Sequence, residues 1–237
     1  MKTVWENVAF FERLVADYAG SKYAVAVDSC SNALFLSIMY NHSKIPPWNK
    51  EKEVPCYRRW NRGLPRINVP KRTYISVPMM AINCGHRIKF TNDKWEGIYK
   101  LEFTPNQDIR FQPLNVVDGA QRFTEGMYEK GSLHCLSFHS KKILSIGRGG
   151  MILTDSSRAC RWLKAARHDG RGSIYYNDLA EKIPPQMVGW HMYMTPEEAI
   201  RGIEQFYKLP KKNPDSGKSS DYKVDLSKLA VFHPHAQ

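Results

Sequence analysis

The sequence lacks the long apolar runs and the leader that mark membrane and secreted proteins. None of its 237 residues falls in an apolar run that approaches the ~18–20 residues of a bilayer span. The first residues, MKTVWENVAFFERL, contain no apolar signal-peptide core and carry two acids early. These absences predict a cytoplasmic protein with no membrane partner.

Cysteine is scarce, and its spacing fits neither a disulfide framework nor a metal site. The five cysteines are Cys30, Cys56, Cys84, Cys135 and Cys160. They are odd in number, form no CxxC pair and stand in no group with histidine at ligand spacing. We therefore expect free thiols and no bound metal.

Acidic residues are few relative to basic ones. The 35 lysines and arginines exceed the 23 aspartates and glutamates, which gives a net charge of +12. Residues 42–72 hold nine of the basic residues and only two acids. Such a segment attracts anions, whether nucleic acid, a membrane surface or a phosphorylated small molecule. A solvated basic loop explains the same composition equally well.

The hydrophobic pattern alternates between helical and strand periods. It predicts helices over 4–19, 31–41, 74–84, 156–167 and 195–208, and strands over 23–28, from 67–69 onward, 87–90, 98–103, 115–118, 133–138 and 149–155. Ser31 is the expected N-cap of the second helix, and Thr195 that of the last. Alternating strands and helices predict an α/β fold of three layers, α/β/α, with a mostly parallel central sheet.

Two segments stand apart from this pattern. Residues 42–66 are rich in proline, tryptophan and arginine and are expected to form an irregular basic insertion. After Leu209 the chain is rich in lysine, proline, serine and aspartate, which is typical of a loose arm. The expected organisation is one domain over 1–209 followed by a short tail over 210–237.

Ligands of α/β sheets bind at the carboxyl ends of the strands, so polar residues at those positions are the candidates. Ser31 and Asn32 follow the first strand and begin a helix, where free backbone N–H groups bind phosphate. Serine at a helix start is also an ordinary cap. Asp118 ends an apolar strand, where a buried carboxylate needs a partner such as a protonated ring nitrogen. It could equally cap the following turn.

Two further candidates follow the same logic. Lys142 lies just beyond the predicted strand 133–138, and a lysine near buried groups can act as an amine nucleophile. A surface lysine is the alternative. Tyr74 begins a predicted helix and could lie flat on a planar ligand, although packing is its commoner use. A phosphate cup, an aromatic, a carboxylate and a lysine are together what pyridoxal 5′-phosphate (PLP) requires.

Four segments in this order resemble one known family. They are FERLVADYAGSKYAVAVDSCSNAL, VPKRTYISVPMMAINCG, VVDGAQ and SFHSKKILSIGRGGMILTD, within Phe11 to Leu209. They are similar to the conserved blocks of the DegT/DnrJ/EryC1/StrS sugar aminotransferases, which are PLP enzymes of fold type I. The resemblance implies the large PLP-binding domain of that fold.

The resemblance also implies a role for each matching residue. Lys142 matches the lysine that binds PLP as a Schiff base, and Asp118 matches the partner of the ring nitrogen. Gln121 matches the residue beside the ring oxygen, and Tyr74 the aromatic stacked on the ring. The residues matching the phosphate site are Ser31, Asn32 and Ser137, together with His191, which replaces an asparagine that reaches the cofactor phosphate of the partner subunit.

The implied activity is transfer of an amino group from an amino acid, with glutamate expected, to a keto group of a nucleotide-linked sugar. The implied assembly is a homodimer with shared active sites. Two alternatives stay open. One is a PLP-dependent sugar dehydratase, although family dehydratases carry histidine in place of the lysine. The other is a degenerate scaffold that binds a protein or, less favoured, nucleic acid through the segment 42–72.

The sequence departs from the family pattern in three places. Cys30 replaces a glycine in the phosphate turn, and Tyr193 replaces an arginine in GWHMYM. Family members usually continue into a small C-terminal domain that helps to bind the sugar, whereas this sequence ends in a tail. The expectation is therefore a short version of the family that lacks most of that domain.

Overall fold

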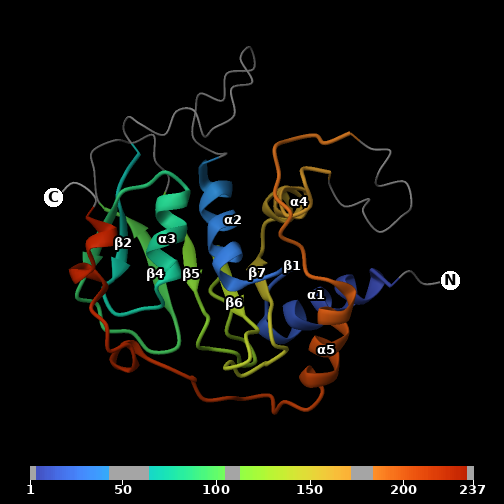
Figure 1. Ribbon diagram of the computed structural model, residues 1–237. Helices are drawn as coiled ribbons and strands as arrows, with labels where there is room; N and C mark the ends of the chain where they lie inside the picture. Colours follow the sequence, from blue (N-terminus) through green and yellow to red (C-terminus); the bar gives the residue numbers. More distant parts are fainter. Residues whose placement is uncertain (1–3, 43–63, 105–112, 172–183, 234–237) are drawn as a thin grey trace.

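The computed structural model describes residues 4–42, 64–104, 113–171 and 184–233 (Figure 1). The helices are α1 Glu6–Ala19, α2 Cys30–His42, α3 Ser76–Asn83, α4 Ser157–Ala166 and α5 Pro196–Phe206. The strands are β1 Tyr23–Val27, β2 Ile67–Pro70, β3 Ile88–Thr91, β4 Tyr99–Phe103, β5 Val116–Asp118, β6 Leu133–Ser137 and β7 Gly150–Thr154. Each predicted helix and strand is confirmed, with ends shifted by a few residues. Most of the predicted insertion 42–66 lies outside the described residues.

The seven strands form one mixed sheet in the order β1-β7-β6-β5-β4-β2-β3. Only the pairs β5–β6 and β2–β3 are parallel, and the other four neighbouring pairs are antiparallel. The prediction of a mostly parallel sheet is therefore wrong. A parallel pair needs a crossover connection, whereas β7 follows its sheet neighbour β6 with no helix between them.

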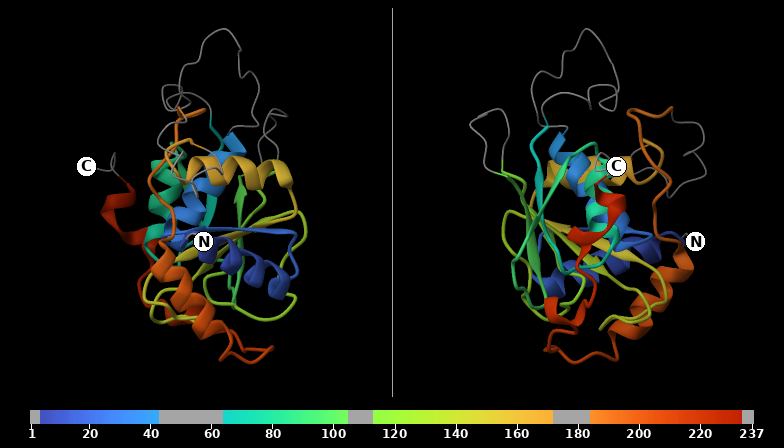
Figure 2. Two further views of the ribbon diagram at one scale, coloured as in Figure 1. Left: turned by 90° about the vertical axis from the view of Figure 1, so that its right-hand side faces the viewer. Right: turned by 60° about the vertical axis from the view of Figure 1, so that its left-hand side comes forward.

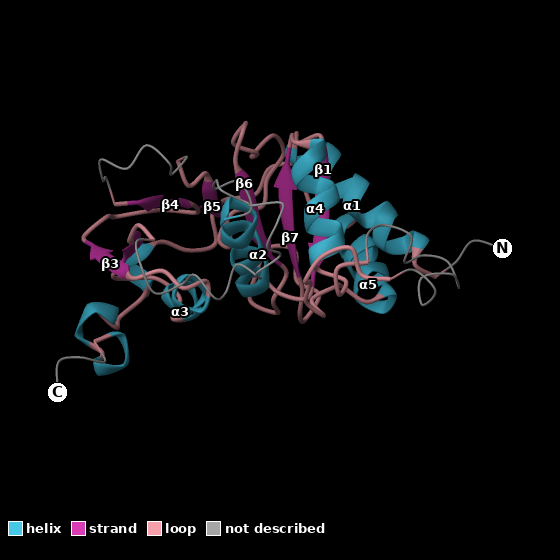
Figure 3. Cartoon of the chain, turned by 90° about the horizontal axis from the view of Figure 1, so that it is seen from above, coloured by secondary structure: helices cyan, strands magenta, loops and turns pink. Residues whose placement is uncertain are grey.

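Helices cover both faces of the sheet, and the alternation of strand side chains separates two apolar clusters. In β1, Val25 and Val27 pack into the cluster with α2, α3 and α4, whereas Ala24 and Ala26 pack into the cluster with α1 and α5. Figure 3 shows α2 and α3 on one side of the sheet. Figure 2 shows α1 and α5 close together at one end of the molecule. The result is an α/β fold with a helical layer on each face.

The C-terminal tail, residues 210–233, packs against its own chain. It runs from α5 to the neighbourhood of β2 along the lower edge of the molecule in Figure 1 and contains three short 3-10 helices, η4 Ser219–Asp221, η5 Leu226–Lys228 and η6 Ala230–Phe232. Leu226 and Phe232 are buried. The expectation of a loose arm is therefore wrong for these residues, because apolar side chains within the polar segment provide anchors.

Two absences hold for the part of the chain that the structure describes. No helix there combines the length and the apolar character needed to cross a bilayer. No three side chains of His, Cys, Asp and Glu gather there as a metal site. The cysteines in the described ranges, Cys30, Cys84, Cys135 and Cys160, are free, and Cys56 lies outside those ranges.

Candidate active site

Sheet pairing brings the predicted site segments to one edge. Gly150, the first residue of β7, lies opposite Val27 of β1 on one side and Ser137 of β6 on the other. On the next strand, Asp118 of β5 lies opposite Cys135 of β6. The turn after β1, the end of β5 and the loop after β6 are therefore neighbours, although they are far apart in the sequence.

The turn between β1 and α2 fits closely against the start of β7. A Cβ atom on Gly150 would lie 2.4 Å from the carbonyl carbon of Ser29 and 2.6 Å from the backbone nitrogen of Cys30. Only glycine allows this approach, because any side chain would push the turn away. The N-terminus of α2, with its free N–H groups, is thus held beside β6 and β7.

The hydroxyls of this turn are used differently from the prediction. The Ser29 hydroxyl accepts a hydrogen bond from the backbone N–H of Asn32 (3.2 Å), so Ser29 caps α2, and the prediction that Ser31 is the cap is wrong. The Ser31 hydroxyl instead pairs with the Ser76 hydroxyl (2.7 Å), and the Asn32 amide donates to Asp28 (2.7 Å). The Ser31 hydroxyl can donate to an anion when the Ser76 hydroxyl is the donor of their shared hydrogen bond.

Lys142 lies in the loop that returns from β6 to β7. Its backbone N–H donates to the His139 carbonyl (2.9 Å), which turns the chain back toward the sheet. The side chain of Lys142 is half-buried, whereas that of Lys141 is exposed. Burial lowers the pKa of the Lys142 amine, while the acidic groups of Cys30 and Asp118 raise it. A lysine in this state loses its proton more readily than a surface lysine.

Asp118 is buried and held by two hydrogen bonds. Its Oδ2 accepts from the Tyr99 hydroxyl (2.6 Å) and its Oδ1 from the backbone N–H of Ala120 (2.9 Å). Burial raises the pKa of the carboxyl, and the hydrogen bonds and the charge of Lys142 lower it. Each carboxylate oxygen retains a lone pair for a further donor.

Tyr99 is a site residue that the sequence analysis missed. It lies directly opposite Asp118 across the β4–β5 pair, and its hydroxyl also contacts the Thr73 hydroxyl (2.6 Å). Burial raises the pKa of this phenol well above its usual value, so it stays protonated and donates to Asp118. The sequence showed a tyrosine in a strand, but only the strand pairing reveals its partner.

Gln121 is held by the C-terminal tail. Its Oε1 accepts from the Ser216 hydroxyl (2.8 Å), and its Nε2 donates to the Tyr222 hydroxyl (2.8 Å). One N–H of the amide remains for another acceptor. The sequence analysis missed Ser216 and Tyr222 because it treated the tail as a loose arm.

The remaining predicted residues lie at the margin of this edge. Tyr74 precedes α3 and is 60% exposed. Ser137 lies opposite Gly150, and its hydroxyl accepts weakly from the backbone N–H of His139 (3.5 Å). His191 is exposed, and its Nδ1 lies 3.1 Å from a carboxylate oxygen of Asp169. The role of His191 toward a partner subunit stays a prediction.

The residues at this edge fit PLP by their chemistry. An amine with a lowered pKa suits the aldehyde, a buried carboxylate with free lone pairs suits the ring nitrogen, and a helix N-terminus with hydroxyls suits the phosphate. The close approach that Gly150 permits holds this helix N-terminus against the start of β7. These groups follow β1, β5 and β6 at one edge of the sheet, and Lys142 interacts electrostatically with both Cys30 and Asp118, so one ligand can contact them all.

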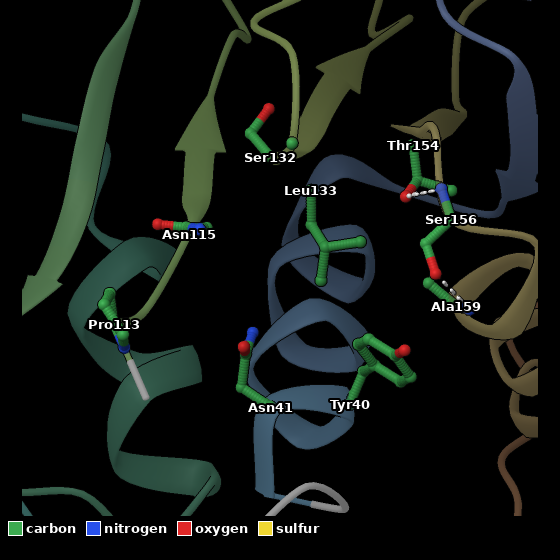
Figure 4. A pocket seen from close by; sticks show the side chains of 10 residues that line it. Tyr40, Asn41, Pro113, Asn115, Ser132, Leu133, Thr154, Ser156 and Ala159 are labelled. Carbon is green, nitrogen blue, oxygen red and sulfur yellow. Dashed lines mark hydrogen bonds between the residues drawn. The ribbon is translucent and has the colours of Figure 1, made fainter. Parts of the chain in front are cut away.

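A separate cavity lies at the opposite edge of the sheet (Figure 4). Its volume is about 110 Å³, and it lies between the end of α2 and the starts of β5 and β6. Polar side chains such as Tyr40, Asn41 and Asn115 line it. None of the predicted site residues lines this cavity, so it is distinct from the candidate active site.

Comparison with solved structures defines the class of the fold. An aminotransferase from Psychrobacter cryohalolentis aligns with a TM-score of 0.61 and 20% identity, over 86% of this chain and 56% of its own. The sugar aminotransferase CalS13 from Micromonospora echinospora aligns with a TM-score of 0.60 and 14% identity, over 86% of this chain and 61% of its own. A GDP-4-keto-6-deoxymannose-3-dehydratase with bound GDP-perosamine aligns with a TM-score of 0.60 and 18% identity, over 88% of this chain and 62% of its own. The chain thus has the α/β fold of these enzymes.

Sequence comparison gives the family. The model of the DegT/DnrJ/EryC1/StrS aminotransferase family matches residues 2–54 and 121–232, and the chain belongs to this family, which uses PLP. An uncharacterised protein of Methanocaldococcus jannaschii is 25% identical over 227 residues, covering 84% of this chain and 56% of its own length. The chain therefore spans little more than half the length of these relatives.

Proposed function

We propose that this protein binds PLP through Lys142 and transfers an amino group from an amino acid to a keto group of a nucleotide-linked sugar. The observation that carries the proposal is geometric: the half-buried Lys142 lies in the loop after β6, beside the strand β5 that ends at the buried Asp118. Membership of the aminotransferase family supports the same reaction class.

Each side chain at this edge has a definite task in that reaction. PLP, when bound, supplies an electron sink for the carbon that exchanges its amino group. Asp118 holds a proton at the ring nitrogen, and Tyr99 and Ala120 hold Asp118 in place. Ser31, Asn32 and Ser137 bind the phosphate with the N-terminus of α2. The Lys142 amine moves the proton of the reacting carbon.

The proposed assembly is a homodimer whose two active sites are shared. His191 is exposed, and it lies in a segment attached to the phosphate turn, because the Asp28 backbone N–H donates to the Met192 carbonyl (3.0 Å). A second copy would place this histidine near the cofactor phosphate of its partner subunit. Sedimentation of the protein at increasing concentration tests for the dimer.

The proposed substrates are glutamate as donor and a nucleotide-linked keto sugar as acceptor. The names of two relatives of the same fold support the sugar: CalS13 is a sugar aminotransferase, and the dehydratase structure holds GDP-perosamine. Amino transfer is favoured over dehydration because Lys142 stands where the dehydratases of the family carry histidine. Turnover of a nucleotide keto sugar with loss of water and no gain of nitrogen would reverse that preference.

The decisive experiment is to add PLP to the purified protein, record the visible spectrum, reduce with borohydride and map the labelled peptide. We expect a visible band, label on Lys142, and bleaching of the unreduced protein by glutamate. Lys142→Ala should remove band and label, whereas Lys141→Ala, an exposed neighbour, should keep both. A folded protein that takes no label contradicts the proposal and favours a scaffold without catalysis. Label on Lys141 contradicts the assignment of the lysine.

A further inference from the structure

We infer, on the basis of the proposed function, that the C-terminal tail completes the active site within its own chain and that Tyr222 is a positioning residue for Gln121. The chain covers 56 to 62% of the length of the relatives named above. Here residues 210–233 lie along the same edge as the candidate site. The proposal concerns what this segment does to the site beneath it.

The tail is fastened at both ends of its path. At its start, the Asn213 amide donates to the Tyr18 hydroxyl (3.0 Å) and to the Phe123 carbonyl (3.0 Å). In the middle, Asp215 accepts two hydrogen bonds from the Arg122 guanidinium (2.8 and 2.6 Å). Near its end, Asp225 forms an ion pair with Lys71 (3.1 Å). Anchors on both sides of the site hold the segment between them in a defined position.

Between these anchors the tail encloses the Gln121 carboxamide. Ser216 donates to its oxygen and Tyr222 accepts from its nitrogen, which fixes which end of the amide faces the site. Gly217 packs directly on the amide, because a Cβ atom there would lie 2.9 Å from the Gln121 side-chain carbonyl carbon. Gln121 is the residue that the family resemblance places beside the cofactor ring oxygen, so the tail determines its orientation.

Tyr222 is itself held in place and is close to Asp118. The Arg72 guanidinium donates to the carbonyls of Tyr222 (2.9 Å) and Lys223 (3.0 Å). The Tyr222 ring lies 5.5 Å from that of Trp95, which lies 4.9 Å from the ring of Tyr99, the donor to Asp118. Tyr222 therefore holds the Gln121 amide and also packs in the aromatic cluster that includes Tyr99, the donor to Asp118.

The test is the variant Tyr222→Phe, which keeps the ring and removes only the hydroxyl that holds Gln121. We expect PLP to bind about 3–10-fold more weakly, since one hydrogen bond to the amide is lost, and the visible band of bound PLP to shift. Ser216→Ala removes the other contact and should act in the same direction. Val224→Ala, an exposed tail residue without contact to Gln121, should match the original protein.

A second readout does not depend on the cofactor. Hydrogen exchange of the PLP-free protein should show residues 210–233 equally protected in Tyr222→Phe and in the original chain, because the anchors at Asn213, Asp215 and Asp225 remain. Unchanged PLP affinity and spectrum in both Tyr222→Phe and Ser216→Ala would overturn the inference. Tighter PLP binding would also overturn it, because the tail would then obstruct the site.

The two proposals fail in distinguishable ways. If the original protein takes no borohydride label on Lys142, the proposed function fails whatever the tail does. If Lys142 is labelled and the tail variants bind PLP like Val224→Ala, the proposed function stands and only the role of Tyr222 fails.

Discussion

The part of the chain that matches the family model and the part that does not make different contributions to one site. Residues 2–54 and 121–232 match, and they carry the phosphate turn, Gln121 and Lys142. The unmatched middle, residues 55–120, carries Tyr74, Tyr99 and Asp118. The β5–β6 pairing joins the two regions, because Asp118 lies opposite Cys135. The candidate site therefore combines residues from both regions.

The two regions also differ in how they are buried. All five residues of β7, in the matched region, are buried, whereas β3 has none fully buried and β4 only Leu101. Lys100 and Glu102 of β4 are exposed, because no helix of the described residues covers that face. The matched region thus supplies most of the packed core, although β2 and β5 of the middle region are largely buried as well. A variant at a buried ion pair of the matched region should therefore lower stability, whereas a variant at Asp118 of the middle region should lower activity.

The largest expected effect on stability comes from Glu12 in the matched region. Its buried carboxylate binds Lys164 (2.8 Å) and the fully buried Arg167 (2.6 Å) and accepts from the Ala26 backbone N–H (3.0 Å). Glu12→Gln should lower the free energy of unfolding by about 3–5 kcal/mol, because it leaves Arg167 buried without its counter-charge. Urea titration measures this loss. Glu6→Gln, an exposed change on the same helix, should alter it by less than about 0.5 kcal/mol.

The middle region should show the reverse pattern at Asp118. Asp118→Asn keeps the shape of the side chain and removes the charge that holds a proton at the ring nitrogen. We expect amino transfer to fall by about 10²–10³-fold, the usual cost of one electrostatic group in an active site. Unfolding by urea should stay at or above the stability of the original protein, because a buried charge is removed. Retained activity would remove Asp118 from the proposed mechanism.

Low pH should reduce the stability of both regions together. Burial lowers the pKa of His42 to about 3 and that of His86 to about 4. The Nε2 atoms of these two histidines lie 2.5 Å apart, between α2 and the segment before β3. Burial also lowers the pKa of His134 to about 4. The unfolded chain therefore takes up protons near pH 6.5, before the folded chain does, so stability falls from there toward pH 4. We expect a loss of about 1–2 kcal/mol per histidine at pH 5.

Thermal unfolding between pH 8 and pH 4 measures this slope. His134→Gln should make the dependence of stability on pH less steep. His139→Gln, a change at an exposed histidine, should leave that dependence unchanged. A stability that does not change between pH 7 and pH 5 would show that these histidines are accessible to protons in the folded protein.

A smaller effect than at Asp118 is expected at Tyr99. Tyr99→Phe removes the donor to Asp118 and leaves the ring packed on Trp95. We expect PLP affinity to fall about 10-fold, because a hydrogen bond to a charged group contributes about 1.5 kcal/mol or more. The control variant is Thr73→Val, because Thr73 contacts Tyr99 but not Asp118. It should reduce PLP affinity less than Tyr99→Phe does. An equal loss in both variants would show that the whole Thr73–Tyr99–Asp118 chain acts as one unit.

Local signals predicted the elements because they are short-range. Thr195 is the N-cap of α5 as predicted, where it forms a capping box with Glu198, and β1 and β7 lie where the pattern predicted strands. Strand direction was predicted wrongly, because β4 and β7 show the same apolar pattern whether they pair parallel or antiparallel. The loose-arm expectation failed for a related reason. Leu226 and Phe232 are isolated apolar residues in a polar segment, and no local pattern shows that the rest of the fold buries them.

The sequence by itself determined the α/β class, the family resemblance, and the candidate residues Lys142, Asp118 and Gln121, because helix caps, periodicity and motif spacing act over a few residues. Only the tertiary structure decided which groups hold them. Tyr99 reaches Asp118 through strand pairing, and Tyr222 reaches Gln121 across about a hundred residues of chain. Such partners are set by where the whole chain packs, and no local pattern encodes that arrangement.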